Sequence, residues 1–126
     1  MREILFRGKN FDNGHWTYGT PITLKNGETY MNFEFMGWID RTLVIPETVG
    51  QYTGLTDKNG TKIFEGDIIG AEDVTFEIRW RGYVSCFTIY KKDVPYPLAP
   101  VEKGIVRNYE VIGNIFDNPE LLEGKS

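Results

Sequence analysis

Three Asn-Gly pairs constrain the fold of this chain more than any other feature of its sequence. They are Asn13-Gly14, Asn26-Gly27 and Asn59-Gly60. Both residue types tolerate the positive φ of a type I′ turn, so Asn-Gly between apolar runs is the strongest short signal of a β-hairpin. The sequence therefore predicts a chain built mainly from hairpins.

The first two pairs lie between runs that have the composition of strands. Residues 4–7 should pair with residues 15–18, and residues 21–24 with residues 28–33. A short strand over residues 42–45 should stop at proline, which has no N–H to donate to a ladder. These runs predict an N-terminal β-meander.

The third pair joins the residues around Leu55 to residues 62–64, and a turn at Glu65-Gly66-Asp67 should begin the next strand. Residues 74–80 then alternate strictly between apolar and polar side chains, which is the pattern of a half-buried strand. Its apolar face would carry Val74, Phe76, Ile78 and Trp80. Arg81-Gly82 should link this strand to another over residues 83–90.

The last third of the chain combines a loop, a strand and a helix. Residues 91–104 hold three prolines, which remove backbone donors and favour an irregular loop. Residues 109–115 should form the final strand. Asn118 before Pro119 places a capping residue ahead of a proline at the first helical position, which predicts a short C-terminal helix.

These elements predict a mainly β fold with two lobes packed as one unit. Residues 1–62 would form an N-terminal β-hairpin or meander lobe, and residues 63–126 an SH3-like small β-barrel lobe that ends in the short helix. The aromatic content of 14% suits this class, because flat rings pack well on pleated sheets.

The only cysteine, Cys86, leaves no intrachain disulfide, which a small secreted domain would usually need. The apolar run near the N-terminus is too short for a signal peptide, and no segment approaches the ~20 apolar residues of a membrane span. We therefore expect a cytoplasmic protein.

A search for catalytic chemistry finds isolated residues rather than a site. His15 is the only histidine, and Ser85 and Cys86 are nucleophiles by residue type alone. Several carboxylates lie close together, but each has a simpler interpretation as a turn or solvated loop residue. They are Glu65 with Asp67, Glu72 with Asp73, and Glu120. We expect no enzyme activity, no cofactor and no metal site.

The clearest candidate binding site is a hairpin that mixes aromatic rings with cations. Single-stranded nucleic acid binds such surfaces, because bases stack on rings and phosphates pair with cations. The site residues would be Arg79, Trp80, Arg81 and Tyr83, with Lys91 and Lys92 beyond them. The alternation favours another interpretation, in which Trp80 packs in the core beside Ile78. The net charge of −4 also supports nucleic-acid binding poorly.

Three blocks of the sequence resemble the YopX family of phage and prophage proteins. The first covers residues 2–9 with Trp16 and Tyr18-Gly19, and the second covers residues 49–68. The third covers residues 109–122. The resemblance implies a phage-derived accessory protein with a β-rich fold and self-association. It implies no activity and carries over no catalytic residue.

Three functions follow, in order of support. The first is a non-enzymatic accessory protein that binds itself or a host or phage protein, because Trp and Tyr are favoured anchors at interfaces. The second is a nucleic-acid-binding module that uses the hairpin at residues 79–83. The third is an enzyme, which would need a pocket that gathers Glu65, Asp67 or His15 from separate parts of the chain.

Overall fold

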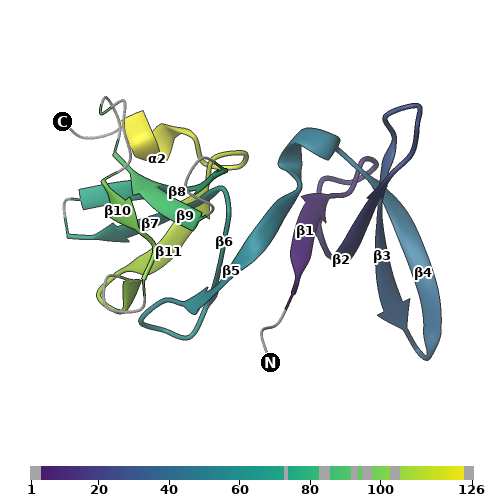
Figure 1. Ribbon diagram of the computed structural model, residues 1–126, viewed down its shortest axis with the longest axis horizontal. Helices are drawn as coiled ribbons and strands as arrows, with labels where there is room; N and C mark the ends of the chain where they lie inside the picture. The colour runs from purple at the N-terminus through teal and green to yellow at the C-terminus, as the bar shows by residue number, and fades with distance from the viewer. Residues whose placement is uncertain are drawn as a thin grey trace. The chain divides into compact units, whose positions relative to one another are not determined.

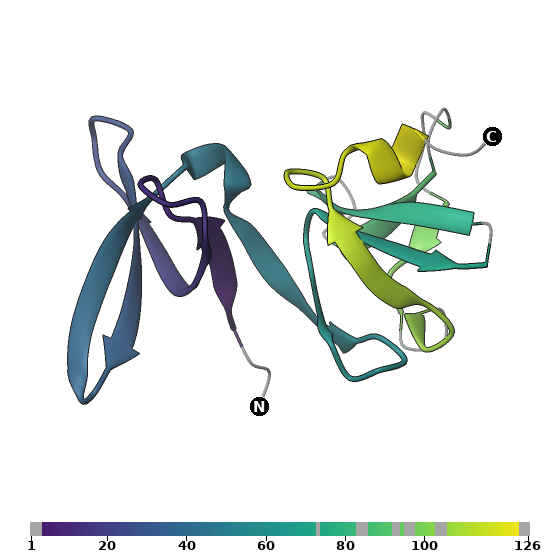
Figure 2. The same cartoon turned by 180° about the vertical axis from the view of Figure 1, so that it is seen from behind.

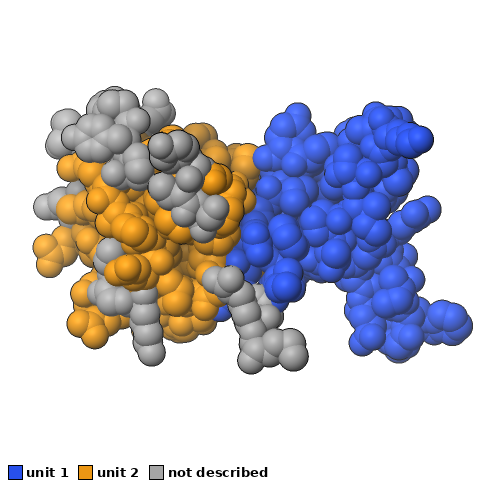
Figure 3. All heavy atoms as spheres, viewed as in Figure 1, with its two compact units in different colours: residues 1–52 blue, residues 53–126 orange. Residues whose placement is uncertain are grey.

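The computed structural model describes residues 4–72, 74–82, 86–91, 94, 98–102 and 106–123. It is mainly β, as the hairpin pattern predicts. The chain divides into two compact units, Met1–Tyr52 and Thr53–Ser126, which are coloured separately in Figure 3. This division falls earlier than the expected boundary at residue 62, because the hairpin around Asn59-Gly60 packs with the later residues.

Unit 1 is an antiparallel meander (Figure 1). Its elements are β1 (Phe6–Lys9), β2 (Trp16–Thr23), β3 (Thr29–Phe35), β4 (Trp38–Val44) and the 3-10 helix η1 (Pro46–Thr48). The strand order is β4-β3-β2-β1, followed by β5 (Gly50–Thr56). Only the first residues of β5 belong to unit 1, where Gly50 lies opposite Arg7.

The core of unit 1 forms where the sheet folds over itself. Met31 and Val44 are fully buried. Gly8 is close to both side chains, since a Cβ atom at Gly8 would lie 3.2 Å from each. A bridge between Asn10 and Val44 brings the end of β1 to the outer edge of β4. This contact covers one end of that edge.

The first hairpin differs in detail from the expectation. Lys9 lies opposite Trp16, so β1 begins and ends two residues later than residues 4–7. The connection is a longer turn in which the Asn10 N–H donates to the His15 carbonyl oxygen at 2.8 Å. The Asn10 side chain stabilises this turn by accepting the Asp12 N–H at 2.8 Å. Asn13-Gly14 therefore lies within a four-residue turn rather than forming a two-residue one.

Unit 2 contains the rest of β5 and a second antiparallel sheet. Its remaining elements are β6 (Lys62–Phe64), β7 (Asp67–Ala71), β8 (Val74–Arg81), β9 (Cys86–Tyr90), β10 (Ala99–Pro100), β11 (Glu110–Asn114) and the helix α2 (Glu120–Glu123). The five-stranded sheet has the order β10-β9-β8-β7-β11. The expected short C-terminal helix and the expected final strand are both present.

The sheet of unit 2, expected to form an SH3-like small β-barrel, is not closed in the part of the chain that the structure describes. The likeness to SH3 domains stays a prediction. β10 and β11 are the two edges of an open sheet. Closure would require these edges to pair along their length. β10 has only two residues and includes Pro100, which cannot donate to a ladder, while the register of β11 shifts between Val111 and Gly113.

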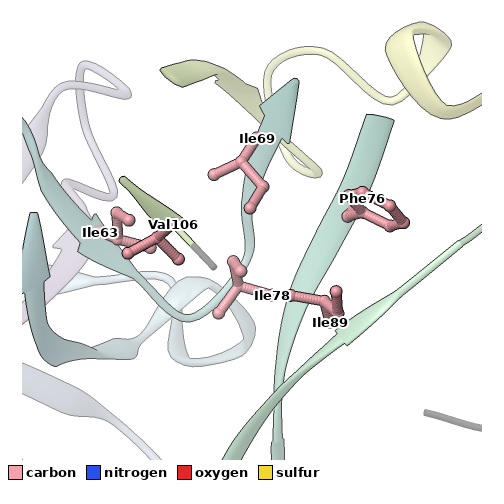
Figure 4. Close-up of a cluster of buried hydrophobic side chains, with 6 residues drawn as sticks. All are labelled: Ile63, Ile69, Phe76, Ile78, Ile89 and Val106. Carbon is pink, nitrogen blue, oxygen red and sulfur yellow. The ribbon is translucent and has the colours of Figure 1, made fainter. Parts of the chain in front are cut away.

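The core of unit 2 is an apolar cluster on one face of this sheet (Figure 4). It consists of Ile63, Ile69, Phe76, Ile78, Ile89 and Val106. Phe76 and Ile78 come from the predicted apolar face of β8, which confirms that part of the alternation. Phe76 also meets Tyr109 edge to face, with ring centroids 5.6 Å apart.

Candidate functional site

The candidate basic and aromatic site lies at the end of β8. Arg79, Trp80 and Arg81 face Thr88, Phe87 and Cys86 on β9. Lys91 follows β9 and is exposed. Tyr83 and Lys92 lie outside the described residues.

The two arginines share one aromatic neighbour, Tyr90. The Arg79 guanidinium carbon lies 4.2 Å from the centre of the Tyr90 ring, and that of Arg81 lies 5.9 Å away. Arg79 also donates from Nη2 to Glu77 Oε1 at 3.1 Å and forms an ion pair with that carboxylate. The hydrogen bond that Arg79 donates to Glu77 raises the pKa of Arg79 above its ordinary value, against the opposing effect of burial. The Glu77 carboxylate therefore offsets part of the Arg79 charge within the same strand, while the Arg79 side chain stays 53% exposed.

The guanidinium of Arg81 makes fewer hydrogen bonds to described residues than that of Arg79. Its Nε atom is buried and has no hydrogen-bond partner in the part of the chain that the structure describes. Arg81 therefore has one donor that the described residues leave unsatisfied, but this buried atom is not itself accessible to a ligand.

Trp80 shows features of both interpretations of the hairpin. Its ring meets Phe87 edge to face, with centroids 4.9 Å apart, on the side of the sheet that carries Ile78. It nevertheless remains 46% exposed. Because neighbouring residues of a strand point to opposite faces, Trp80 lies on the other face from Arg79 and Arg81. A ligand on one face cannot stack on Trp80 and pair with both arginines.

The other sequence candidates have structural roles or lie apart from one another. His15 is exposed, and its backbone closes the first hairpin. Asp67 is buried, and its Oδ2 accepts the Phe64 N–H at 2.7 Å across the turn at Gly66. Cys86 is half-buried within β9. Ser85 and Asp73 are outside the described residues.

The most unusual surface was not predicted from the sequence. It is the end of the β3–β4 hairpin, called here the hairpin tip and defined by Phe35, Met36, Trp38 and Ile39 with Gly37 in the turn. The four apolar residues are 59%, 84%, 77% and 74% exposed, in that order. Monomeric proteins usually expose large apolar residues singly, so four of them at one end of a hairpin make this end a candidate interaction surface.

The turn at the hairpin tip has a strained backbone. Phe35 lies opposite Trp38, so Met36 and Gly37 form a two-residue turn, with φ values of 51° and 84°. Positive φ at both positions is typical of type I′, which prefers Asn or Gly. A methionine side chain disfavours this conformation, so Met36 is unfavourable here both for its backbone and for its exposure.

The hairpin tip extends beyond the rest of the sheet because β2 is shared between two neighbours. Residues 16–19 of β2 pair with β1, and residues 20–23 pair with β3. The change of partner occurs at Gly19, where a Cβ atom would lie 2.0 Å from the Asn32 carbonyl oxygen. Past Asn32, β3 pairs only with β4 among the described strands. Figures 1 and 2 show the resulting two-stranded arm.

Described residues cover the outer edge of β4 at one end only. The Leu43 carbonyl oxygen accepts the Phe11 N–H at 2.9 Å. Further along, Asp40 Oδ1 accepts the Arg41 N–H at 2.8 Å, which reduces the capacity of this edge to pair with another strand. The side chains of the hairpin tip, rather than the edge itself, are therefore the main unpartnered feature of the arm.

A groove of about 430 Å³ opens where β3 separates from β2. Its walls are Tyr18, Gly19, Thr20, Asn32, Phe33, Glu34 and Ile39. Tyr18 is 47% exposed, and Ile39 belongs both to this wall and to the hairpin tip. The Asn32 amide donates to the Thr20 carbonyl oxygen at 3.3 Å, which joins the two strands at the base of the groove.

The fold and this site define an all-β protein with two sheet units and an exposed apolar arm. The family model described as "YopX protein" matches residues 5–123, so the chain belongs to the YopX family. This confirms the resemblance found in the sequence.

Among the solved structures that match, one is similar over nearly the whole chain. It is the crystal structure of protein EF1440 from Enterococcus faecalis, with 24% sequence identity and a TM-score of 0.61. The alignment covers 97% of this chain and 99% of that protein. At this identity the similarity concerns the fold. A search of curated proteins gave no match.

No helix in the described part of the chain is long and apolar enough to cross a membrane.

Proposed function

We propose that this YopX-family protein is a non-enzymatic phage or prophage accessory protein that acts in the host cytoplasm by binding proteins, including further copies of itself. One observation carries the proposal: the hairpin tip exposes four large apolar side chains in five consecutive residues. Trp and Met are enriched at protein interfaces, and a tip of this kind is suited to insertion into a concave partner surface.

The backbone of the hairpin tip supports the same proposal. Asn tolerates positive φ better than Met does, so an Asn at position 36 would lower the backbone strain of the turn. It would also remove an exposed methionine. The sequence instead has methionine, which fits this turn less well than Asn, at the most exposed position of the hairpin tip. Strain of this kind concentrates at binding sites, where the exposed group has a role that stability alone does not explain.

An affinity pull-down of the tagged protein from host cells tests the proposal, with the bound proteins identified by mass spectrometry after nuclease treatment. We expect proteins that bind wild type and the control Ile4→Thr but not Ile39→Thr. The two isoleucines are 71% and 74% exposed, so the variants lose similar side chains at different places. Equal capture by all three proteins would contradict a role for the hairpin tip.

The alternative is a nucleic-acid-binding module that uses the β8–β9 hairpin. The position of the two arginines beside the same ring, that of Tyr90, favours it. It predicts binding of a single-stranded oligonucleotide that weakens with salt and is reduced by both Arg79→Ala and Arg81→Ala. If neither substitution weakens binding of the oligonucleotide, this hairpin is not the binding site. If the wild-type protein does not bind the oligonucleotide at low salt, the nucleic-acid function is excluded.

A further inference from the structure

One face of the sheet in unit 1 carries aromatic rings together with cations. Met31 and Val44 are buried on the opposite face, and neighbouring residues of a strand point to opposite faces. The strand registers therefore place five such residues on one surface, called here the aromatic face. They are Lys9, Trp16, Tyr18, Tyr30 and Arg41. We infer that the aromatic face binds single-stranded nucleic acid, an activity separate from the protein binding proposed for the hairpin tip.

The rings and the cations of the aromatic face contact one another. The Arg41 guanidinium carbon lies 4.8 Å from the centre of the Tyr30 ring. Lys9 Nζ lies 5.8 Å from the centre of the Trp16 ring, and the guanidinium carbon of the buried Arg7 lies 4.3 Å from the same ring. A strand whose bases stack on these rings would therefore have its phosphates close to cations, which is the combination that single-stranded nucleic acid requires.

Arg41 is the cation of the aromatic face that is best placed to bind a phosphate. It is exposed, and its guanidinium makes no hydrogen bond or ion pair with any residue that the structure describes. The contact with the Tyr30 ring holds the side chain in position without supplying an oxygen acceptor to its five N–H donors. Phosphate oxygens are suitable acceptors for these donors.

The charge of the aromatic face is opposite to that of the whole chain, which is −4. The strands β1 to β4 place Arg7, Lys9 and Arg41 on this face and only one carboxylate, that of Glu34. The local potential, rather than the net charge, determines where a polyanion binds. Carboxylates elsewhere on the molecule would repel phosphates and so favour binding at this face.

The aromatic face has an arrangement that the β8–β9 hairpin lacks. In that hairpin, Trp80 lies on the other face of the sheet from Arg79 and Arg81. On the aromatic face, Tyr30 and Arg41 point to the same side, so one strand can stack on rings and pair with cations.

The groove between β2 and β3 opens on the aromatic face. Tyr18 and Ile39 are apolar walls of the groove, and Thr20 and Asn32 are polar ones. Asn32 lies opposite Arg41 on β4, so the groove connects Tyr18 to Arg41 along one surface. A nucleobase has apolar faces and polar edges, which match these two kinds of wall.

Fluorescence anisotropy of a labelled oligothymidylate of roughly 15 nucleotides, titrated with the full-length protein at low salt, tests the inference. We expect wild type to bind, and Tyr18→Leu to raise the dissociation constant about tenfold, because leucine removes the ring. Tyr18→Phe is the matched control. It keeps the ring and should bind as wild type does. Circular dichroism of each variant checks that the fold is retained.

The salt dependence of binding tests the role of Arg41. Each lost phosphate contact should lower the slope of log affinity against log salt concentration by about 0.7, so we expect this change in Arg41→Gln. Arg107→Gln is the control, because Arg107 is exposed and lies outside the aromatic face. It should leave the slope unchanged. Arg41 is on the surface, so this test does not depend on a substitution in the core.

Three results would overturn the inference. The first is no binding of the oligonucleotide by wild type at low salt. The second is weaker binding in Arg79→Ala and Arg81→Ala but not in Tyr18→Leu, which would place the site on the β8–β9 hairpin. The third is displacement of the oligonucleotide by inorganic polyphosphate as effectively as by unlabelled oligothymidylate, which would show that charge alone is recognised. Tip-dependent capture of a protein in the pull-down would stand in all three cases.

Discussion

The carboxylate of Asp57 joins two distant parts of unit 2 by accepting the backbone N–H of Val111 at 2.8 Å through Oδ2. Its other oxygen, Oδ1, accepts the N–H groups of Asn59 and Thr61 at 2.8 and 2.9 Å. One buried side chain therefore holds the β5–β6 turn in shape and fixes it to β11.

Asp57→Ala should destabilise the protein strongly. It leaves three backbone donors without their acceptor, and we expect the free energy of unfolding to fall by roughly 2–4 kcal/mol. Urea denaturation measures this change. Asp12→Ala is the matched control, because Asp12 is exposed, and it should change stability by less than about 0.5 kcal/mol. Similar losses in both variants would contradict the role of Asp57.

The stability of the protein should decrease in acid through the same residue. Burial raises the pKa of Asp57, but the hydrogen bonds from Val111, Thr61 and Asn59 and the nearby Lys58 outweigh it, and the pKa lies below its ordinary value of 3.8. A carboxyl group with a lowered pKa in the folded state stabilises above its unfolded pKa, and this contribution is lost as pH falls through the folded value.

Urea titrations at a series of pH values check this prediction. We expect the free energy of unfolding to fall as the pH drops below about 4, and the Asp57→Asn variant to show a shallower fall. Equal acid dependence in wild type and Asp57→Asn would assign the effect to other carboxylates.

Gly19→Ala should disrupt the point where β2 changes partner. A Cβ atom there would lie 2.0 Å from the backbone oxygen of Asn32, and backbone cannot move aside as a side chain can. We expect a loss of roughly 3 kcal/mol, seen as a lower melting temperature. Gly82→Ala is the control, because its Cβ atom would meet nothing closer than 3.7 Å among the residues that the structure describes.

Met36→Asn should separate stability from association. Asn tolerates positive φ better than Met, so we expect a gain of roughly 0.5–1 kcal/mol in unfolding free energy. The same change removes an apolar side chain from the hairpin tip and should weaken self-association. Thermal melting and sedimentation of one preparation measure both effects.

Glu72→Asn provides the control for Met36→Asn. Glu72 is the other non-glycine residue with positive φ in the described part of the chain, at 53°. It lies outside the hairpin tip, so its replacement should raise stability without changing association. A Met36→Asn variant that associates as strongly as wild type would remove Met36 from the interface.

The hairpins illustrate how far local chemistry predicts this fold. Asn59-Gly60 lies in the predicted connection between β5 and β6, because its signal depends only on neighbouring residues. Only Gly60 has positive φ, at 85°, so the turn is longer than the two-residue type I′ turn that the pair predicts. The turn at Met36-Gly37 was missed, since Phe-Met-Gly-Trp has no residue at its first turn position that favours positive φ. The alternation of Met31, Phe33 and Phe35 was its only available signal.

The β class, the alternating core face of β8 and the membership of the YopX family can all be predicted from the sequence. These features follow from turn chemistry, side-chain periodicity and the order of similar residues. That the second sheet stays open, and that the arm at Met36 and Trp38 extends past its neighbours, is visible in the three-dimensional structure alone. The exposure of a side chain depends on which strands lie over it. At Gly19, β2 stops pairing with β3 and pairs with β1 instead, so no part of β2 lies beside the end of the β3–β4 hairpin.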